Sequence, residues 1–235
     1  MNKTTHAVLA TLLSAAIPLF SAETAWKSDT APKLKPGNFE ELLINGRPVK
    51  VFQHGVRPEW GYSQPQQDTF ILVHPKNERK NAPLYVVLHS AGHDVVSCLK
   101  CTRTVGNHDI YRSPDDFYAL YLDCRANKGD WWWGGMHMGD AKLTQRNSGS
   151  ELCPAEKRVM DTIRWVIAKY ATDPNRVYLS GNSMGGSGTL GIGLRHGDVF
   201  AAIKANVPAG IEHVSHRMGF APQTIAESVK LPDPP

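Results

Sequence analysis

Beyond its first 22 residues the sequence has no apolar run long enough to cross a bilayer, which excludes a membrane-spanning helix from that part of the chain. It also lacks a dense block of lysine and arginine, and its net charge is only +4, so no nucleic-acid partner is predicted. No internal repeat and no low-complexity tract occurs, which argues against solenoid and fibrous architectures. With 41% hydrophobic and 20% charged residues over 235 positions, the remainder has the composition of one globular domain.

The first 22 residues are typical of an export signal. Lys3 supplies a positive charge, residues 7–20 are almost entirely apolar, and the small residues Ser21 and Ala22 follow. This run is too short for a membrane span but fits the hydrophobic region of a signal peptide. A buried N-terminal helix or a lipid-facing anchor is the alternative. We therefore expect a secreted or periplasmic protein, with a signal peptide at 1–22, an N-terminal arm at 23–38 and one domain at 39–235.

Cysteine is scarce, with four residues in the whole chain: Cys98, Cys101, Cys124 and Cys153. An exported protein meets an oxidising compartment, so four cysteines predict two disulfides, with three pairings open. A zinc site is the competing interpretation, because Cys98-x-x-Cys101 has the spacing of a ligand pair. The other two cysteines are single and widely spaced, which favours disulfides that brace loops near the active site. No metal and no cofactor is predicted.

Buried strands and amphipathic helices alternate along the chain, which predicts an α/β fold. The continuous apolar run at 84–88 suits a strand buried on both faces, as in a parallel sheet. Residues 154–170 carry one apolar stripe at helical spacing and begin with a proline, which suits the first turn of a helix. The expected elements are one or two strands between 39 and 60 around the Asn45-Gly46 turn, strands at 69–74, 84–88, 117–122, 176–180 and 199–207, and helices at 154–170 and 184–196. This order predicts a mostly parallel sheet with helices on both faces.

One motif carries the chemistry: Gly181-Asn182-Ser183-Met184-Gly185 matches G-x-S-x-G. It lies between a buried strand and a helix, which is the context in which this motif presents a nucleophilic serine on a tight turn. The turn needs small neighbours, and the following helix favours negative charge at its N-terminus. We therefore predict Ser183 as the nucleophile and the backbone amide of Met184 as one oxyanion donor.

A second element, Leu88-His89-Ser90-Ala91-Gly92-His93, directly follows the buried strand at 84–88. Hydrolases with this elbow take their other oxyanion donor from a loop after an earlier strand. We expect that donor to be the amide of Ala91, with Ser90 as the alternative.

Several side chains around these two loops are candidate contacts for a substrate. Aromatic rings in the long loop before the 154–170 helix can stack on sugars or acyl groups, or pack the loop against the domain. The substrate-binding candidates are Trp131, Trp132, Trp133 and His89.

These segments resemble the secreted esterases grouped with polyhydroxybutyrate depolymerases, feruloyl esterases and acetylxylan esterases. The similarity rests on LYVVLHSAGH, on DPNRVYLSGNSMGGSG and on FAAIKANVPAG, and covers about residues 84–210. It implies an α/β-hydrolase fold, a Ser-Asp-His triad, a carboxylic ester substrate and no metal. It also supports Ser183 as nucleophile and Met184 and Ala91 as oxyanion donors.

The triad acid and histidine are not evident in the sequence. In this fold they follow the serine, normally after two further strands, yet only residues 211–235 remain after the last expected strand. We therefore expect a domain that lacks its last strands, with little esterase activity from the chain as written. A helix end explains two of the available candidates, His196 and Asp198, better than catalysis does. The others are His213, His216, Glu212, Glu227 and Asp233.

Three functions remain open at this point. The leading hypothesis is an exported carboxylic ester hydrolase that forms an acyl-enzyme, acting on polysaccharide-linked or polyester-type esters. A peptidase similar to prolyl oligopeptidase would use the same elbow. A non-catalytic glycan-binding homologue would use the tryptophans, but it would have no need of a strained serine turn.

Overall fold

The computed structural model describes residues 45–55, 57–62, 68–102, 106, 109–124, 132–133, 152–209 and 214. The predicted signal peptide and N-terminal arm lie outside these residues. The elements in chain order are β1 (Val49–Gln53), η3 (Pro58–Trp60), β2 (Thr69–Val73), β3 (Leu84–Leu88), α1 (Val95–Cys101), η4 (Asp109–Tyr111), β4 (Tyr118–Leu122), α3 (Pro154–Tyr170), β5 (Val177–Asn182), α4 (Met184–Arg195) and β6 (Ala202–Asn206). None of these helices is both long and apolar enough to cross a membrane.

The described strands form one six-stranded sheet in the order β1-β2-β4-β3-β5-β6. β1 and β2 pair antiparallel, as do β2 and β4, whereas β4, β3, β5 and β6 run parallel. Central strand β3 is almost entirely buried, as its unbroken apolar sequence predicts. The predicted mostly parallel sheet is therefore confirmed.

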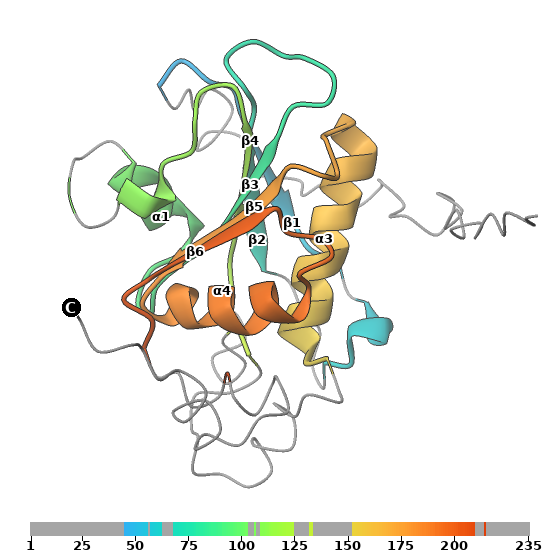
Figure 1. Ribbon diagram of the computed structural model, residues 1–235, viewed down its shortest axis with the longest axis vertical. Helices are drawn as coiled ribbons and strands as arrows, with labels where there is room; N and C mark the ends of the chain where they lie inside the picture. The colour runs from blue at the N-terminus through green and yellow to red at the C-terminus, as the bar shows by residue number, and fades with distance from the viewer. Residues whose placement is uncertain are drawn as a thin grey trace, which may run out of the picture.

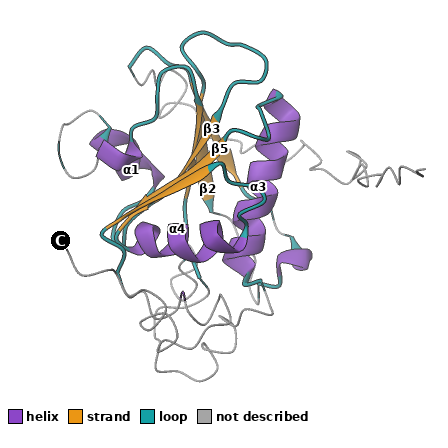
Figure 2. Cartoon of the chain, viewed as in Figure 1, coloured by secondary structure: helices purple, strands orange, loops and turns teal. Residues whose placement is uncertain are grey.

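Helices cover both faces of this sheet, as Figures 1 and 2 show. On one face α3 and α4 enclose a core that includes Leu72, Val86 and Leu120. On the other face α1 and η4 pack over Ile71, Val87 and Tyr121. Successive residues of a strand point to opposite faces, which is why neighbouring positions enter different cores.

The register of the parallel strands brings the candidate site together. Leu88 at the end of β3 pairs with Gly181 near the end of β5, and Asn182 pairs with Asn206 at the end of β6. Ligands bind open α/β sheets beyond the carboxyl ends of their strands. The loop after β3 and the turn after β5 therefore emerge side by side at the edge where chemistry is expected.

The expected strands from residue 69 onward and the helices at 154–170 and 184–196 agree with the structure, apart from one or a few residues at their ends. Of the one or two strands expected between 39 and 60, β1 lies after the Asn45-Gly46 turn, and residues 39–44 lie outside the described residues. Helix α1 was not predicted, because its first residues, Val95 and Val96, are β-branched and weak helix formers. Its N-terminus is stabilised by a reciprocal cap, in which the Asp94 side chain accepts from the Ser97 amide and the Ser97 hydroxyl accepts from the Asp94 amide.

The prediction of two disulfides is not supported, since no disulfide bond joins any of the four cysteines, all of which are described. Cys98 and Cys101 lie on α1 and not in a loop, and Cys153 is the N-cap residue of α3. Cys98 faces the core under α1, whereas Cys124 belongs to the core on the opposite face. The sheet therefore separates Cys98 from Cys124. Within the described ranges no group of three or more candidate ligands is placed to hold a metal ion.

Candidate active site

Ser183 occupies a strained turn between β5 and α4. Its backbone has φ 53° and ψ −114°, and its amide donates to the carbonyl of Asn206 at 2.9 Å. Residues other than glycine rarely adopt such a backbone conformation. When they do, the surrounding structure enforces the strain, often at functional sites. The side chain is only partly buried. The strand, the sharp turn and the helix are those that the sequence motif predicts.

The glycines of the motif are required by close backbone contacts. A Cβ on Gly181 would lie 2.2 Å from the carbonyl oxygen of Gly185. A Cβ on Gly185 would lie 2.0 Å from the carbonyl oxygen of Leu88. Both distances are far below any ordinary contact, so neither position accepts a side chain without movement of the backbone. The absence of side chains lets the start of α4 pack against the end of β3.

The loop after β3 forms a tight turn over residues 90–93. The His93 amide donates to the Ser90 carbonyl at 3.1 Å, and Gly92 has a φ of +78°, as a type II turn requires at its third position. The Ser90 amide donates to the hydroxyl of Tyr111 at 3.1 Å. Since that hydrogen bond uses the Ser90 amide, Ala91, which is exposed, is the better candidate for the second oxyanion donor.

The N-terminus of α4 favours negative charge beside Ser183. Met184 is the first helical residue, and the amides of a first helical turn have no acceptor within their own helix. These amides and the helix dipole together stabilise an anion, and the first turn of α4 contains no acidic residue that would oppose this. The geometry thus suits the predicted role of Met184.

His89 is buried beneath this loop, with 1% of its surface exposed. Its Nδ1 lies 2.8 Å from the Ser90 carbonyl and its Nε2 3.1 Å from Asp123 Oδ1. The Cys124 amide also donates to Nε2, at 3.1 Å. The contacts of His89 therefore support the base of the loop, which differs from the substrate contact that we expected.

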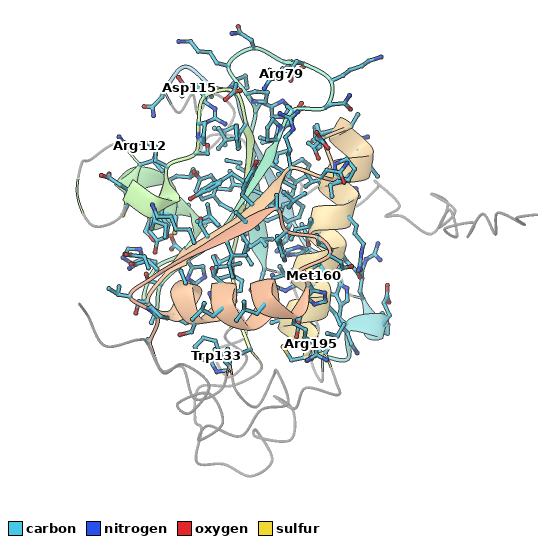
Figure 3. All side chains as sticks on the ribbon, viewed as in Figure 1. Arg79, Arg112, Asp115, Trp133, Met160 and Arg195 are labelled. Carbon is cyan, nitrogen blue, oxygen red and sulfur yellow. The ribbon has the colours of Figure 1, made fainter. Side chains whose placement is uncertain are left out.

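Two of the three adjacent tryptophans are also core residues. Trp132 is fully buried and donates from Nε1 to the His89 carbonyl at 3.0 Å. Its side chain lies directly over Gly188 of α4, where a Cβ would approach it to 2.5 Å. Trp133 is 3% exposed, and Figure 3 shows it beside α4. The expected stacking of these two rings on a substrate does not fit their burial, and Trp131 lies outside the described residues.

Of the candidates for the acid and histidine, the structure describes only His196 and Asp198, and neither lies beside Ser183. His196 caps the far end of α4, about 18 Å along the helix from the elbow, and its Nε2 lies 2.9 Å from the buried carboxylate of Glu156. Figure 3 shows the neighbouring Arg195 at this end of α4, beside α3. Asp198 follows and is exposed. His213, His216, Glu212, Glu227 and Asp233 lie outside the described residues.

Two polar residues of the site were missed by the sequence reasoning. Asn182 occupies the variable position of the motif, and its side chain donates to Ser90 Oγ at 3.0 Å. Tyr111 belongs to η4, and its hydroxyl lies 2.7 Å from Ser90 Oγ. Burial raises the pKa of Tyr111, so this phenol keeps its proton and acts as a donor. Neither residue has a signal in the sequence, because both contacts join segments far apart in the chain.

Comparisons with known proteins agree with this geometry. A model of the prolyl oligopeptidase family matches residues 157–212, which span most of α3 and all of β5, the elbow, α4 and β6. No curated protein sequence matches the chain.

Similar solved structures include a protein named sOPH, with 15% identity and a TM-score of 0.52 over 76% of this chain and 56% of that one. A thermostable esterase has 22% identity and a TM-score of 0.51 over 74% of this chain and 44% of that one. An S-formylglutathione hydrolase from Agrobacterium tumefaciens has 17% identity and a TM-score of 0.49 over 72% and 60%. This chain therefore spans less than two thirds of the length of each.

The chain has the α/β-hydrolase fold. In an α/β-hydrolase the serine of the strand-to-helix turn is the nucleophile position, and the loop after an earlier strand supplies an oxyanion donor. Ser183 lies on such a turn after β5 and Ala91 lies in the loop after β3, so these two residues are the candidates for the two roles.

Proposed function

We propose that this chain is a serine hydrolase that cleaves carboxylic esters through an acyl-enzyme on Ser183. The observation that supports it most is the backbone of Ser183, held at φ 53° between a buried strand and the N-terminus of α4. Backbone strain of this kind occurs mainly at functional sites, and here it would present the serine hydroxyl above the sheet as a nucleophile.

In the proposed reaction Ser183 Oγ attacks the ester carbonyl, and the negative charge moves to the carbonyl oxygen. The amides of Met184 and Ala91 donate to that oxygen, and the dipole of α4 stabilises the charge. The alcohol leaves and water hydrolyses the acyl-enzyme. Both steps need a general base, and no histidine within the described ranges is hydrogen-bonded to Ser183. His213 and His216, which lie outside the described residues, remain the candidates for that base.

We further propose an exported enzyme that acts on polysaccharide-linked or polyester-type esters. Support comes from the apolar run at residues 7–20 and from the similarity of residues 84–210 to esterases of that group. Trp131 remains a candidate for contact with such a substrate, whereas the burial of Trp132 and Trp133 weakens the proposal of a glycan-binding protein without catalysis.

Labelling with a fluorophosphonate tests the central proposal directly, because this reagent needs only an activated serine. We expect covalent labelling at Ser183 and hydrolysis of p-nitrophenyl acetate, both lost in Ser183→Ala. Ser97→Ala is the matched control, since it removes a serine hydroxyl from the cap of α1 and should leave both signals intact. A peptide substrate assayed in parallel separates an esterase from a peptidase similar to prolyl oligopeptidase.

The proposal is wrong if the parent protein is not labelled and does not hydrolyse the ester. It is also wrong if labelling persists unchanged in Ser183→Ala. Glycan binding without labelling, retained in Ser183→Ala, would instead identify a non-catalytic binding protein.

A further inference from the structure

Four hydrogen bonds join the amide and the hydroxyl of Ser90, in the loop after β3, to two other segments. Its amide donates to Tyr111 Oη at 3.1 Å, and its Oγ lies 2.7 Å from that same hydroxyl. Its Oγ also donates to the Asn182 carbonyl at 2.9 Å and accepts from Asn182 Nδ2 at 3.0 Å. All three residues are buried, with 6% of Ser90 and of Asn182 exposed and none of Tyr111. We call Ser90, Tyr111 and Asn182 the Ser90 clamp.

The directions of these four hydrogen bonds can be assigned without conflict. A serine hydroxyl has one proton and two acceptor positions, and a phenol has one proton and accepts as well. Ser90 Oγ gives its proton to the Asn182 carbonyl, so the Tyr111 hydroxyl gives its own proton to Ser90 Oγ. Tyr111 Oη then accepts from the Ser90 amide. A buried network in which each member is satisfied holds its parts in one arrangement.

The Ser90 clamp is anchored at both ends. On one side Asn206 Nδ2 donates to Asn182 Oδ1, and the carbonyl of Asn206 accepts from the Ser183 amide. On the other side the hydroxyl of Tyr121, on β4, donates to the carbonyl of Tyr111 at 2.7 Å. The chain of contacts therefore runs from β4 through Ser90 to the residue before the nucleophile and on to β6.

Each of the two candidate oxyanion donors is close in the chain to a different member of the Ser90 clamp. Ala91 follows Ser90 directly, and Met184 lies two residues after Asn182. Catalysis by an oxyanion hole requires both amides within about 3 Å of one oxygen before the reaction begins. Nothing within a single element fixes that separation, because one amide belongs to the loop after β3 and the other to α4.

We propose that Ser90, Tyr111 and Asn182 are positioning residues that set the distance between the Ala91 and Met184 amides. This inference rests on the proposed esterase function. None of the three needs to touch the substrate, so loosening the Ser90 clamp should slow the chemical step and leave ground-state binding almost unchanged. A purely structural role would instead lower stability without this separation of kcat from KM.

The test compares Tyr111→Phe, Ser90→Ala and the double variant with Tyr85→Phe as the matched control. Tyr85 lies against the same core, and its hydroxyl donates to the carbonyl of Ile110 at 2.7 Å and not to Ser90. Each tyrosine variant thus loses one phenolic hydroxyl, from the buried Tyr111 or from the partly buried Tyr85. The measurements are kcat and KM on p-nitrophenyl acetate, the midpoint of thermal unfolding, and amide hydrogen exchange over residues 89–93.

For each clamp variant we expect kcat to fall about 10- to 100-fold, with KM within about 2-fold of the parent. The double variant should lose little more than the worse single variant, because residues that act as a unit are not additive. Exchange over residues 89–93 should accelerate in the clamp variants only. Tyr85→Phe should keep kcat within about 2-fold even if its unfolding midpoint drops as much as that of Tyr111→Phe.

The inference is overturned if folded clamp variants keep the parent kcat, or if Tyr85→Phe loses as much. Unchanged exchange over residues 89–93 would overturn it as well, and this readout does not depend on turnover. If the parent protein is neither labelled at Ser183 nor able to hydrolyse the ester, the proposed function is wrong, and the Ser90 clamp has no catalytic role to support. These failures are distinguishable, because the last one is seen in the parent and the others only in the variants.

Discussion

Gly185→Ala should damage both stability and activity, because the added methyl group meets backbone that cannot rotate away. Its Cβ would lie 2.0 Å from the Leu88 carbonyl oxygen and 2.8 Å from that of His89, whereas real Cβ atoms essentially never come closer than 3.0 Å. The start of α4 and the end of β3 must therefore separate by at least about 1 Å. Overpacking of this kind costs about 1–3 kcal/mol, and we expect the upper end because no side-chain rotation relieves it.

The same displacement should reduce catalysis out of proportion to stability. Leu88 and His89 lead directly into the loop that carries Ala91, and Gly185 follows Met184, so the substitution should push the two proposed oxyanion donors apart. A misplacement of about 1 Å can lower the rate of a catalysed reaction by about 100-fold. We expect kcat/KM on p-nitrophenyl acetate to fall by at least that factor at a temperature where the variant is still folded.

Urea unfolding and ester hydrolysis of Gly185→Ala, measured beside Gly197→Ala, test this reasoning. Gly197 lies just beyond α4 and is exposed, and a methyl group added there would have only one atom, the Leu194 carbonyl oxygen, within 4.0 Å. Its substitution should change the unfolding free energy by less than about 1 kcal/mol. A Gly185→Ala protein with the stability and kcat/KM of the parent would refute the argument.

Three further predictions follow from the strain at the elbow and from buried charges. Ser183→Gly should raise the free energy of unfolding by about 1 kcal/mol in urea titrations relative to Ser183→Ala, because glycine tolerates the φ of 53°; equal stability of the two variants would contradict this. Burial, with Arg158 nearby, lowers the pKa of His54 well below its usual value, so the unfolded chain takes up a proton near pH 6.5 that the folded chain does not. Stability should therefore fall as the pH drops below about 6.5, by up to about 1.4 kcal/mol per pH unit, and His54→Phe should flatten that slope in urea titrations. Arg158→Met should lower the free energy of unfolding by about 3–5 kcal/mol, because it leaves the buried Asp68 carboxylate, which lies 3.2 Å from the guanidinium, without its cation. Adding Asp68→Leu should restore much of that stability. An Arg158→Met protein as stable as the parent would exclude a stabilising role for this ion pair.

The elements that could be predicted from the sequence are those that depend on residues close together in the chain. Helix α3 has the predicted bounds, because Pro154 marks its first turn and the stripe that includes Val159 and Ile163 faces the core. The elbow was predictable for a related reason. Only glycine fits at positions 181 and 185, where a Cβ would collide with the backbone, so these two glycines appear in the sequence as part of a motif.

The features that were not predictable depend on contacts between distant segments. The Ser90 clamp joins Ser90 to Asn182, 92 positions away, and no residue near Asn182 in the sequence indicates that contact. Trp132 is buried because Gly188 leaves room for its ring and the His89 carbonyl accepts its N–H. Three tryptophans in a row have no periodicity that would indicate this. The same holds for Cys98 and Cys124, whose separation by the sheet becomes visible only once the strands are assembled.

The glycines that allow α4 to approach the sheet also deprive it of any independent tendency to be a helix. Five of its twelve residues are glycine, and each costs about 1 kcal/mol relative to alanine in a helix interior. A peptide with this sequence should be unstructured in water. We therefore expect helix α4 to form only when β3, β5 and β6 are in place to receive it, and the turn at Ser183 to become ordered late in folding.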